Sequence, residues 1–249
     1  PLQKKFKNYN HFLKPIMSLR YSPNGNSDIS TKDVLLNYDN VFSLNRIGTS
    51  NQVEGGDALS MGLEFKRSNK LGEDILDFKI ANVLKSKENL KLPSKSKLNK
   101  TRSDLFGSLT YNLNNNLKLG YDFSYDRDLR HSNLEGLNVD IKLNNIFTDF
   151  YYYTTDNDLG QNETISNSTV VNFNNENKLK FSTTKDLLDN FTEYYDLIYS
   201  YETDCISLNL NYNKSFYNDG NLEPNESLSF LIKIIPFTEL GVNNIGSLI

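Results

Sequence analysis

Cysteine and histidine are scarce in this chain of 249 residues, which contains one Cys, two His and no Trp. A single thiol, Cys205, excludes a disulfide within the chain and cannot build a metal cluster by itself. His11 and His131 stand in no recognisable arrangement with a nucleophile, and no serine lies in a G-x-S-x-G turn. We therefore expect no enzymatic activity, no cofactor and no metal site.

An excess of positive charge is also lacking, since 27 Lys and Arg are set against 31 Asp and Glu, for a net charge of -4. Proteins that bind nucleic acid present a basic face or stripe, so we exclude that partner. No apolar run approaches the roughly 20 residues of a membrane-spanning helix. A search for long apolar runs does not detect a transmembrane β-barrel, because each strand carries only about 10 residues of alternating hydrophobicity.

The residues that are abundant are those of strands and turns, with 15 Tyr, 15 Phe and asparagine-rich turns such as NLNNN, NNEN and NDGN. Apolar and polar residues alternate strictly in four segments, residues 59–66, 117–126, 137–144 and 205–215. In the second of these, Leu119, Tyr121 and Phe123 oppose Lys118 and Asp122. A period of two predicts a strand with one apolar and one polar face.

Weaker strand patterns occur in residues 12–21, 74–83, 105–113, 146–155, 168–174, 178–187, 194–202 and 228–237. Together the segments predict about a dozen strands joined by turns. No amphipathic helix interrupts them, which argues against a parallel βαβ sheet. The predicted fold class is all-β, with antiparallel strands.

Two architectures share this alternation. In a soluble sandwich the apolar face is buried between sheets, whereas in a membrane barrel it meets lipid and the polar face lines the lumen. Many segments have the 9 to 11 residues of a membrane strand, longer than the usual mode of about 5 to 6. Tyrosines near strand ends, such as Tyr151, Tyr153 and Tyr194, suit an interfacial girdle. These features favour a transmembrane β-barrel.

The alternation stops in DNVFSLNRIGTSNQVEGG, residues 39–56. The run holds Asp39, Asn40, Phe42, Asn45 and Arg46, followed by Glu54, Gly55 and Gly56. Its glycines allow backbone turns closed to other residues, and Arg46 and Glu54 could pair in a polar lumen or rim. An ordinary solvated loop is the alternative. Our hypothesis is that the run packs inward and orders the barrel wall.

This run resembles the LPS-assembly outer-membrane protein family, LptD, in its C-terminal barrel portion. The family shows D-N-L-F-x-x-N-R-F and then G-x-D-R-x-E-x-G before a strand, but here Thr49, Ser50, Asn51 and Gln52 replace G-x-D-R. The segment FLKP with LRYSP, in residues 12–23, is similar to the family's preceding strand. Residues 193–217, which contain EYYDLIY, Cys205 and YNKSFY, resemble its closing strands.

The resemblance implies lipopolysaccharide transport and insertion into the outer leaflet of the outer membrane of a Gram-negative bacterium. Residues 1–249 are then the C-terminal part of a very large barrel, with the N-terminal periplasmic domain and the first strands absent. The implied partners are lipopolysaccharide, a lipoprotein plug, membrane lipid and, through the missing domain, the periplasmic transport bridge. In the family a cysteine near the C-terminus is bridged to the N-terminal region, so Cys205 is the candidate for that disulfide.

Cargo contacts are expected on the polar strand faces, where the lumen-facing candidates are Lys118, Asp122, Asn138, Asp140, Lys142, Asn209, Asn211 and Asn213. Hydrated side chains without cargo contact are the alternative for each. The basic segment 90–102 could contact phosphorylated sugars or remain hydrated. A general porin or a receptor-type outer-membrane barrel has the same strand pattern and stays open as an alternative function.

Overall fold

The computed structural model describes residues 1–23, 28–31, 34–47, 54–157, 160–216, 224–234 and 238–242. These residues form a single antiparallel sheet of 14 strands in sequence order. The strands are β1 (Leu2–Lys5), β2 (Tyr9–Ser22), β3 (Gly56–Asn69), β4 (Asp74–Leu84), β5 (Leu105–Asn114), β6 (Leu117–Tyr125), β7 (Ser132–Leu143), β8 (Ile146–Asn157), β9 (Gly160–Asn172), β10 (Asn177–Asp186), β11 (Phe191–Glu202), β12 (Ile206–Ser215), β13 (Asn225–Ile234) and β14 (Thr238–Val242). A search of the described residues for a helix that could span a membrane finds none.

The predicted all-β antiparallel class is confirmed, and every segment predicted as a strand overlaps one. The pattern missed β1 and β14, and it placed the start of β9 at Ser168 instead of Gly160. The early part of β9, GQNETIS, lacks alternation but still pairs with β10, Thr164 opposite Asp186. Backbone pairing thus extends β9 beyond its apolar side chains. Residues 235–237 and the NDGN turn lie outside the described residues.

The chain divides into two compact units, which are described in turn. The first comprises Pro1–Leu113, Lys118–Leu137 and Thr154–Gln161. In β2 the apolar face is open to the surroundings, with Met17, Leu19 and Tyr21 between 73% and 78% exposed. The polar face of β3 presents Ser60, Gly62 and Glu64. In this unit the alternation predicted from the sequence therefore separates an exposed apolar face from a polar one.

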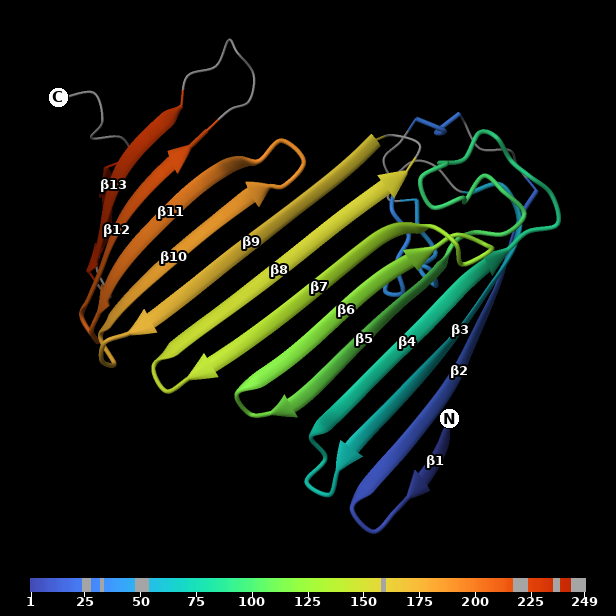
Figure 1. Cartoon of the computed structure of the whole chain (residues 1–249), viewed down its shortest axis with the longest axis horizontal. Coiled ribbons are helices and arrows are strands. Elements are labelled where there is room, and N and C mark those ends of the chain that lie inside the picture. Colours follow the sequence, from blue (N-terminus) through green and yellow to red (C-terminus); the bar gives the residue numbers. More distant parts are fainter. Residues whose placement is uncertain are drawn as a thin grey trace. The chain divides into compact units, whose positions relative to one another are not determined.

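The buried core of the first unit lies on the polar face of the strands, not on the apolar one. It is made by the β2–β3 loop (described residues 28–31, 34–47, 54 and 55) and the β4–β5 loop (residues 85–104) packed on β3, β4 and β5. Its members are Ile29, Leu36, Tyr38, Val41, Ile47, Ala58, Ala81, Val83, Leu92, Leu98 and Phe106. Figure 1 shows both loops gathered at the same end of β2–β5, while short turns join the strands at the other end.

The two loops are also joined by hydrogen bonds. The backbone N–H of Ile29 donates to the carbonyl of Lys91 at 2.9 Å, and that of Leu36 donates to Ser96 Oγ at 2.8 Å. Leu92 and Leu98 are buried with 0% and 1% exposure. The expectation that segment 90–102 either contacts sugars or remains hydrated is therefore wrong for Leu92 and Leu98, which complete the core, whereas Leu90 is 69% exposed.

The second unit comprises Asn114–Leu117, Asn138–Tyr153 and Asn162–Ile249. Cross-strand register places Phe181, Leu197 and Tyr212 in one row of β10–β12, and Ser182, Asp196 and Asn213 in the next. Exposure alternates in the same way along β11, where Tyr195, Leu197 and Tyr199 are each 39% exposed. The apolar rows of this unit are thus uncovered, as a lipid-facing surface requires.

Asparagines close several of the turns between strands. Asn144 and Asn190 have positive φ values of 47° and 51°, a conformation that asparagine tolerates better than most residues. A β-sandwich needs two packed sheets, whereas the described residues form a single one. The sandwich alternative is therefore wrong.

Candidate functional site

The motif run of residues 39–56 forms the inner part of the β2–β3 loop. Asn40 and Asn37 each accept a hydrogen bond from the other's backbone N–H at 3.0 Å, and Asn40 Nδ2 donates to the carbonyl of Leu35 at 2.9 Å. Asp39 and Asn45 are exposed. Gly56 begins β3 with φ of 93°, where a side chain would strain the backbone. Gly48 and Thr49–Gln52 lie outside the described residues.

Arg46 and Glu54 form a buried bidentate pair. Arg46 Nε lies 2.6 Å from Glu54 Oε2, and Arg46 Nη2 lies 2.7 Å from Glu54 Oε1. The side chains are 1% and 2% exposed. Arg46 Nη1 also donates to Ser60 Oγ at 2.8 Å, which ties the loop to the polar face of β3. The pairing that the sequence suggested is thus present, and its surroundings are protein, not solvent.

Two further cations reach the same carboxylate from distant parts of the chain. Arg20 Nη1, near the end of β2, lies 2.7 Å from Glu54 Oε2, and Lys85 Nζ, just after β4, lies 2.8 Å from Glu54 Oε1. Arg20 Nη2 additionally donates to the carbonyl of Ser43. Sequence reasoning named Arg20 only as part of a strand and missed Lys85. We call Arg20, Arg46, Glu54 and Lys85 the ion cluster.

The ion cluster holds one negative and three positive groups in a buried setting. Burial by itself would raise the pKa of Glu54, but hydrogen bonds and charges from Arg46 and Lys85 outweigh it and lower the pKa to about 2. Burial lowers the pKa of Lys85, although Glu54 opposes the shift. Glu54 is therefore firmly ionised at neutral pH and links β2, the two loops and β3.

Aromatic residues fix the same loop farther along β3. Phe42 packs on Gly62, where an added Cβ would lie 2.6 Å from Phe42 Cζ. The Tyr38 ring contacts Phe42 edge to face, with ring centroids 5.6 Å apart, and its hydroxyl donates a hydrogen bond to Glu64 Oε1 at 3.0 Å. Lys14 Nζ lies 3.0 Å from Glu64 Oε2. The loop therefore lies flat on the polar face instead of extending away from it.

Asp104, at the end of the β4–β5 loop, is a second buried charge that sequence reasoning missed. Its Oδ2 accepts hydrogen bonds from Asn133 Nδ2 at 2.8 Å and Ser124 Oγ at 3.2 Å. Its Oδ1 is buried and has no hydrogen-bond partner in the described part of the chain. Burial raises the pKa of Asp104 to about 6, against the effect of the two donors. No periodicity or motif marks this residue.

The predicted lumen-facing residues lie on polar strand faces in both units. Lys118 and Asp122 belong to β6, and Asp122 interacts electrostatically with Asp39 and Lys79. In β7, Asp140 accepts a hydrogen bond from Asn138 at 2.8 Å, and Lys142 lies over the ring of Phe147 at 5.1 Å.

In β12, Asn209 Oδ1 accepts a hydrogen bond from Ser200 Oγ at 2.7 Å. Asn211 Oδ1 is buried without a hydrogen-bond partner among the described residues. Asn213 lies on the same face. Contact of any of these residues with cargo remains a prediction.

Cys205 is an exposed free thiol in the turn between β11 and β12. His11 packs between Phe6 and Phe65, at ring distances of 4.7 and 5.5 Å. His131 lies in the turn between β6 and β7, where its backbone N–H donates to Asp126. In the ranges that the structure describes, no three His, Cys, Asp or Glu side chains are placed to hold a metal ion.

Comparison with known families gives a match over most of the chain. The model of the family described as LptD, LPS transport system D, matches residues 1–184. This stretch contains the whole ion cluster, both loops and Asp104, and it ends within β10. No curated protein matches the chain.

Proposed function

The chain belongs to the LptD family of lipopolysaccharide transport proteins, and on this premise we propose that it forms part of the wall of an outer-membrane β-barrel that inserts lipopolysaccharide into the outer leaflet. In this proposal residues 1–249 are the C-terminal part of the barrel domain. The N-terminal periplasmic domain of the parent protein receives the lipid from periplasmic bridge proteins, and a lipoprotein plugs the barrel.

The separation of strand faces carries the proposal. An amphiphile needs an apolar path for its acyl chains and a wet path for its sugars, and one sheet with opposed faces supplies both. In β12, Leu208 and Leu210 alternate with Asn209 and Asn211, and Leu210 is 41% exposed. The apolar residues suit contact with the bilayer, and the polar ones suit a hydrated lumen.

The packed loops support the same function. Because the β2–β3 and β4–β5 loops lie on the polar face, they occupy space that is lumen in a closed barrel. The ion cluster and the Phe42 contact with Gly62 hold them there. We infer that these loops narrow the polar path and stiffen the wall beside it.

Site-specific photo-crosslinking in cells tests the proposal. A photoreactive residue replaces Asn209 in the full-length parent, and the matched control carries it at Leu210 on the opposite face. We expect an adduct with lipopolysaccharide at Asn209 that depends on transport energy, whereas any lipid adduct at Leu210 should be independent of it. Absence of the energy-dependent adduct at Asn209 and at Asp140 would refute cargo passage and favour a porin-like pore.

A further inference from the structure

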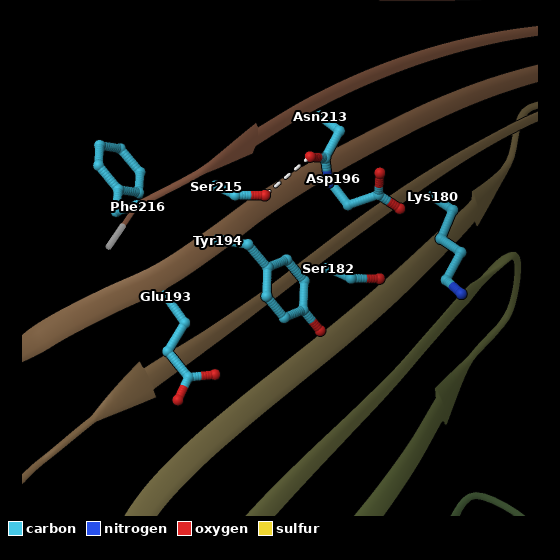
Figure 2. A pocket seen from close by; sticks show the side chains of 8 residues that line it. All are labelled: Lys180, Ser182, Glu193, Tyr194, Asp196, Asn213, Ser215 and Phe216. Atoms are coloured by element: carbon cyan, nitrogen blue, oxygen red, sulfur yellow. Dashed lines mark hydrogen bonds between the residues drawn. The ribbon is translucent and has the colours of Figure 1, made fainter. Parts of the chain in front are cut away.

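A polar groove crosses β10, β11 and β12 on the polar face of the second unit. It is a wide, open hollow with a volume of about 640 Å³. Lys180 and Ser182 come from β10, Tyr194 and Asp196 from β11, and Asn213 from β12. Figure 2 shows these side chains along adjacent strands, with the Tyr194 ring beside Ser182. We call this the β10–β12 groove.

The groove contains polar groups whose hydrogen-bonding capacity is unused. Ser182 is only 8% exposed, and its Oγ has no hydrogen-bond partner in the described ranges. Asp196 and Lys180 form no ion pair with any described residue. Asn213 accepts one hydrogen bond, from Ser215 Oγ at 3.0 Å. Buried polar groups are nearly always partnered, so the Ser182 hydroxyl has the capacity to bind a polar group that enters the groove.

The chemistry of the groove selects the class of ligand. One cation, Lys180, is accompanied by two carboxylates, Glu193 and Asp196, so the lining does not favour a purely anionic group. Donors and acceptors are mixed, which matches hydroxyl groups that both donate and accept. The ring of Tyr194 offers an apolar surface beside them, as the C–H face of a sugar ring requires.

We propose that the β10–β12 groove binds a saccharide, with Asp196 and Asn213 accepting from sugar hydroxyls and Lys180 and Ser182 donating to sugar oxygens. The inference rests on the proposed function, in which the sugar portion of lipopolysaccharide passes along the polar face. It goes beyond that function by assigning a saccharide-binding site to strands that lie largely outside the family match, which ends at residue 184.

The test uses the full-length protein in detergent with purified lipopolysaccharide and a photoreactive residue at Asn213. The control places the same residue at Tyr212, its neighbour on the opposite face. Free oligosaccharide, released from lipopolysaccharide by mild acid, is added as competitor. We expect an adduct at Asn213 that the oligosaccharide suppresses, and no suppression at Tyr212. Suppression by inorganic phosphate alone would overturn the saccharide assignment.

The position at which no adduct forms, Asn209 or Asn213, distinguishes a failure of this inference from a failure of the proposed function. An energy-dependent adduct in cells at Asn209 without any adduct at Asn213 would overturn the groove and leave transport intact. Absence of adducts at both positions would refute transport and the groove together.

Side-chain variants give a second, quantitative test. We expect Asp196→Ala and Lys180→Ala each to raise the oligosaccharide concentration needed for half-suppression about tenfold, because each removes a charge-assisted hydrogen bond. Lys178 lies on the same face of β10 but outside the groove, so Lys178→Ala should leave the half-suppressing oligosaccharide concentration unchanged. If Asp196→Ala does not fold, the near-isosteric Asp196→Asn should fold, and its half-suppressing oligosaccharide concentration should lie between those of the wild type and of Lys180→Ala. Equal values for all variants would contradict the proposal.

Discussion

At the position of Glu54 a single carboxylate compensates three cations, Arg20, Arg46 and Lys85, in a buried setting. A buried ion pair adds little over an apolar replacement, yet removal of one partner leaves the others uncompensated and is strongly destabilising. Glu54 is the only carboxylate in the ion cluster and touches every other member. Loop order should therefore be more sensitive to this residue than to any one cation.

Glu54→Gln in the full-length protein should destabilise the packed β2–β3 and β4–β5 loops by roughly 3–5 kcal/mol, since the buried Arg46 and Lys85 and the partly buried Arg20 lose their counter-charge. Limited proteolysis in detergent would show it as faster cleavage within the two loops. The matched control is Glu88→Gln, whose carboxylate is 51% exposed and lies 3.5 Å from Lys100 Nζ. That change should cost at most about 1 kcal/mol. Equal protection of the two variants would contradict the role given to Glu54.

Two carboxylates of the loops should give the packed loops opposite responses to pH. Asp104 has a folded pKa of about 6, above its ordinary 3.8, so the folded state takes up the proton first and gains stability as pH falls from 6 towards 4. Glu54 has a folded pKa of about 2, below its ordinary 4.5, so its contribution is lost as pH falls from 4.5 towards 2.

Hydrogen exchange of amides in residues 85–104, corrected for the intrinsic rate, should therefore slow about tenfold from pH 7 to 5 and accelerate below about pH 4. Asp104→Asn keeps an acceptor for Asn133 and removes the charge, so it should abolish the slowing of exchange between pH 7 and 5. It should also stabilise the loops at pH 7 by roughly 2–3 kcal/mol. A variant that retains the change between pH 7 and 5 would show that another group titrates there.

Cys205 is exposed, which leaves it accessible to a partner thiol. We expect it to bridge to the N-terminal region of the parent, so the full-length protein should migrate differently on reducing and non-reducing gels. Cys205→Ser should remove the difference. Identical mobility of the wild type under both conditions would exclude the disulfide.

At the scale of elements, the contact between the β2–β3 loop and β3 depends on the absence of a side chain at Gly62. An added Cβ would lie 2.6 Å from Phe42 Cζ and 3.0 Å from the carbonyl oxygen of Ile80. The ring can move more easily than the backbone of β4. The position of Phe42 is thus determined jointly by the loop and by the strand beneath it.

Gly62→Ala should destabilise the loop packing by about 1–3 kcal/mol, through overpacking against Phe42. In a Phe42→Leu background the same change should cost less, because the shorter side chain leaves room for the methyl group. A double-mutant cycle, read by thermal unfolding of the full-length protein, measures the coupling. Additive effects would show that Phe42 is not the obstacle.

At the scale of the whole molecule, the proposed function requires that the two faces of the sheet meet different surroundings. Leu210 and Asn211 are consecutive residues of β12 on opposite faces. A comparison of the same substitution at the two positions therefore reports on the surroundings and not on the strand.

Leu210→Arg should destabilise the full-length protein in lipid bilayers, lowering its free energy of unfolding by up to about 2–4 kcal/mol, because it places a charge against hydrocarbon. Asn211→Arg should cost much less, since the proposed function places its side chain on the lumen face and not against hydrocarbon. Unfolding by denaturant in phospholipid vesicles measures both. A larger cost at Asn211 would reverse the assignment of the faces.

Much of this architecture follows from local pattern. The alternation of residues 59–66 predicted β3 with its two faces, and the motif run predicted the pairing of Arg46 with Glu54, only 8 residues apart. Arg20 could not be assigned to the same carboxylate, because its contact spans 34 residues of sequence and depends on how the loop folds back. Asp104 and Ser182 were missed for a different reason, because the burial of a single polar side chain leaves no periodic signal in the sequence.

Local pattern predicted 12 of the 14 strands, their antiparallel arrangement and the two faces, because the direction of a side chain along a strand is a local property with a period of two. The position of the core, in contrast, depends on tertiary contacts. Leu92 and Leu98 belong to a basic segment that reads as a hydrated loop, yet they are buried with Ile29 and Leu36 on the polar face. Burial there requires partners from distant segments, and no local pattern specifies which segments meet.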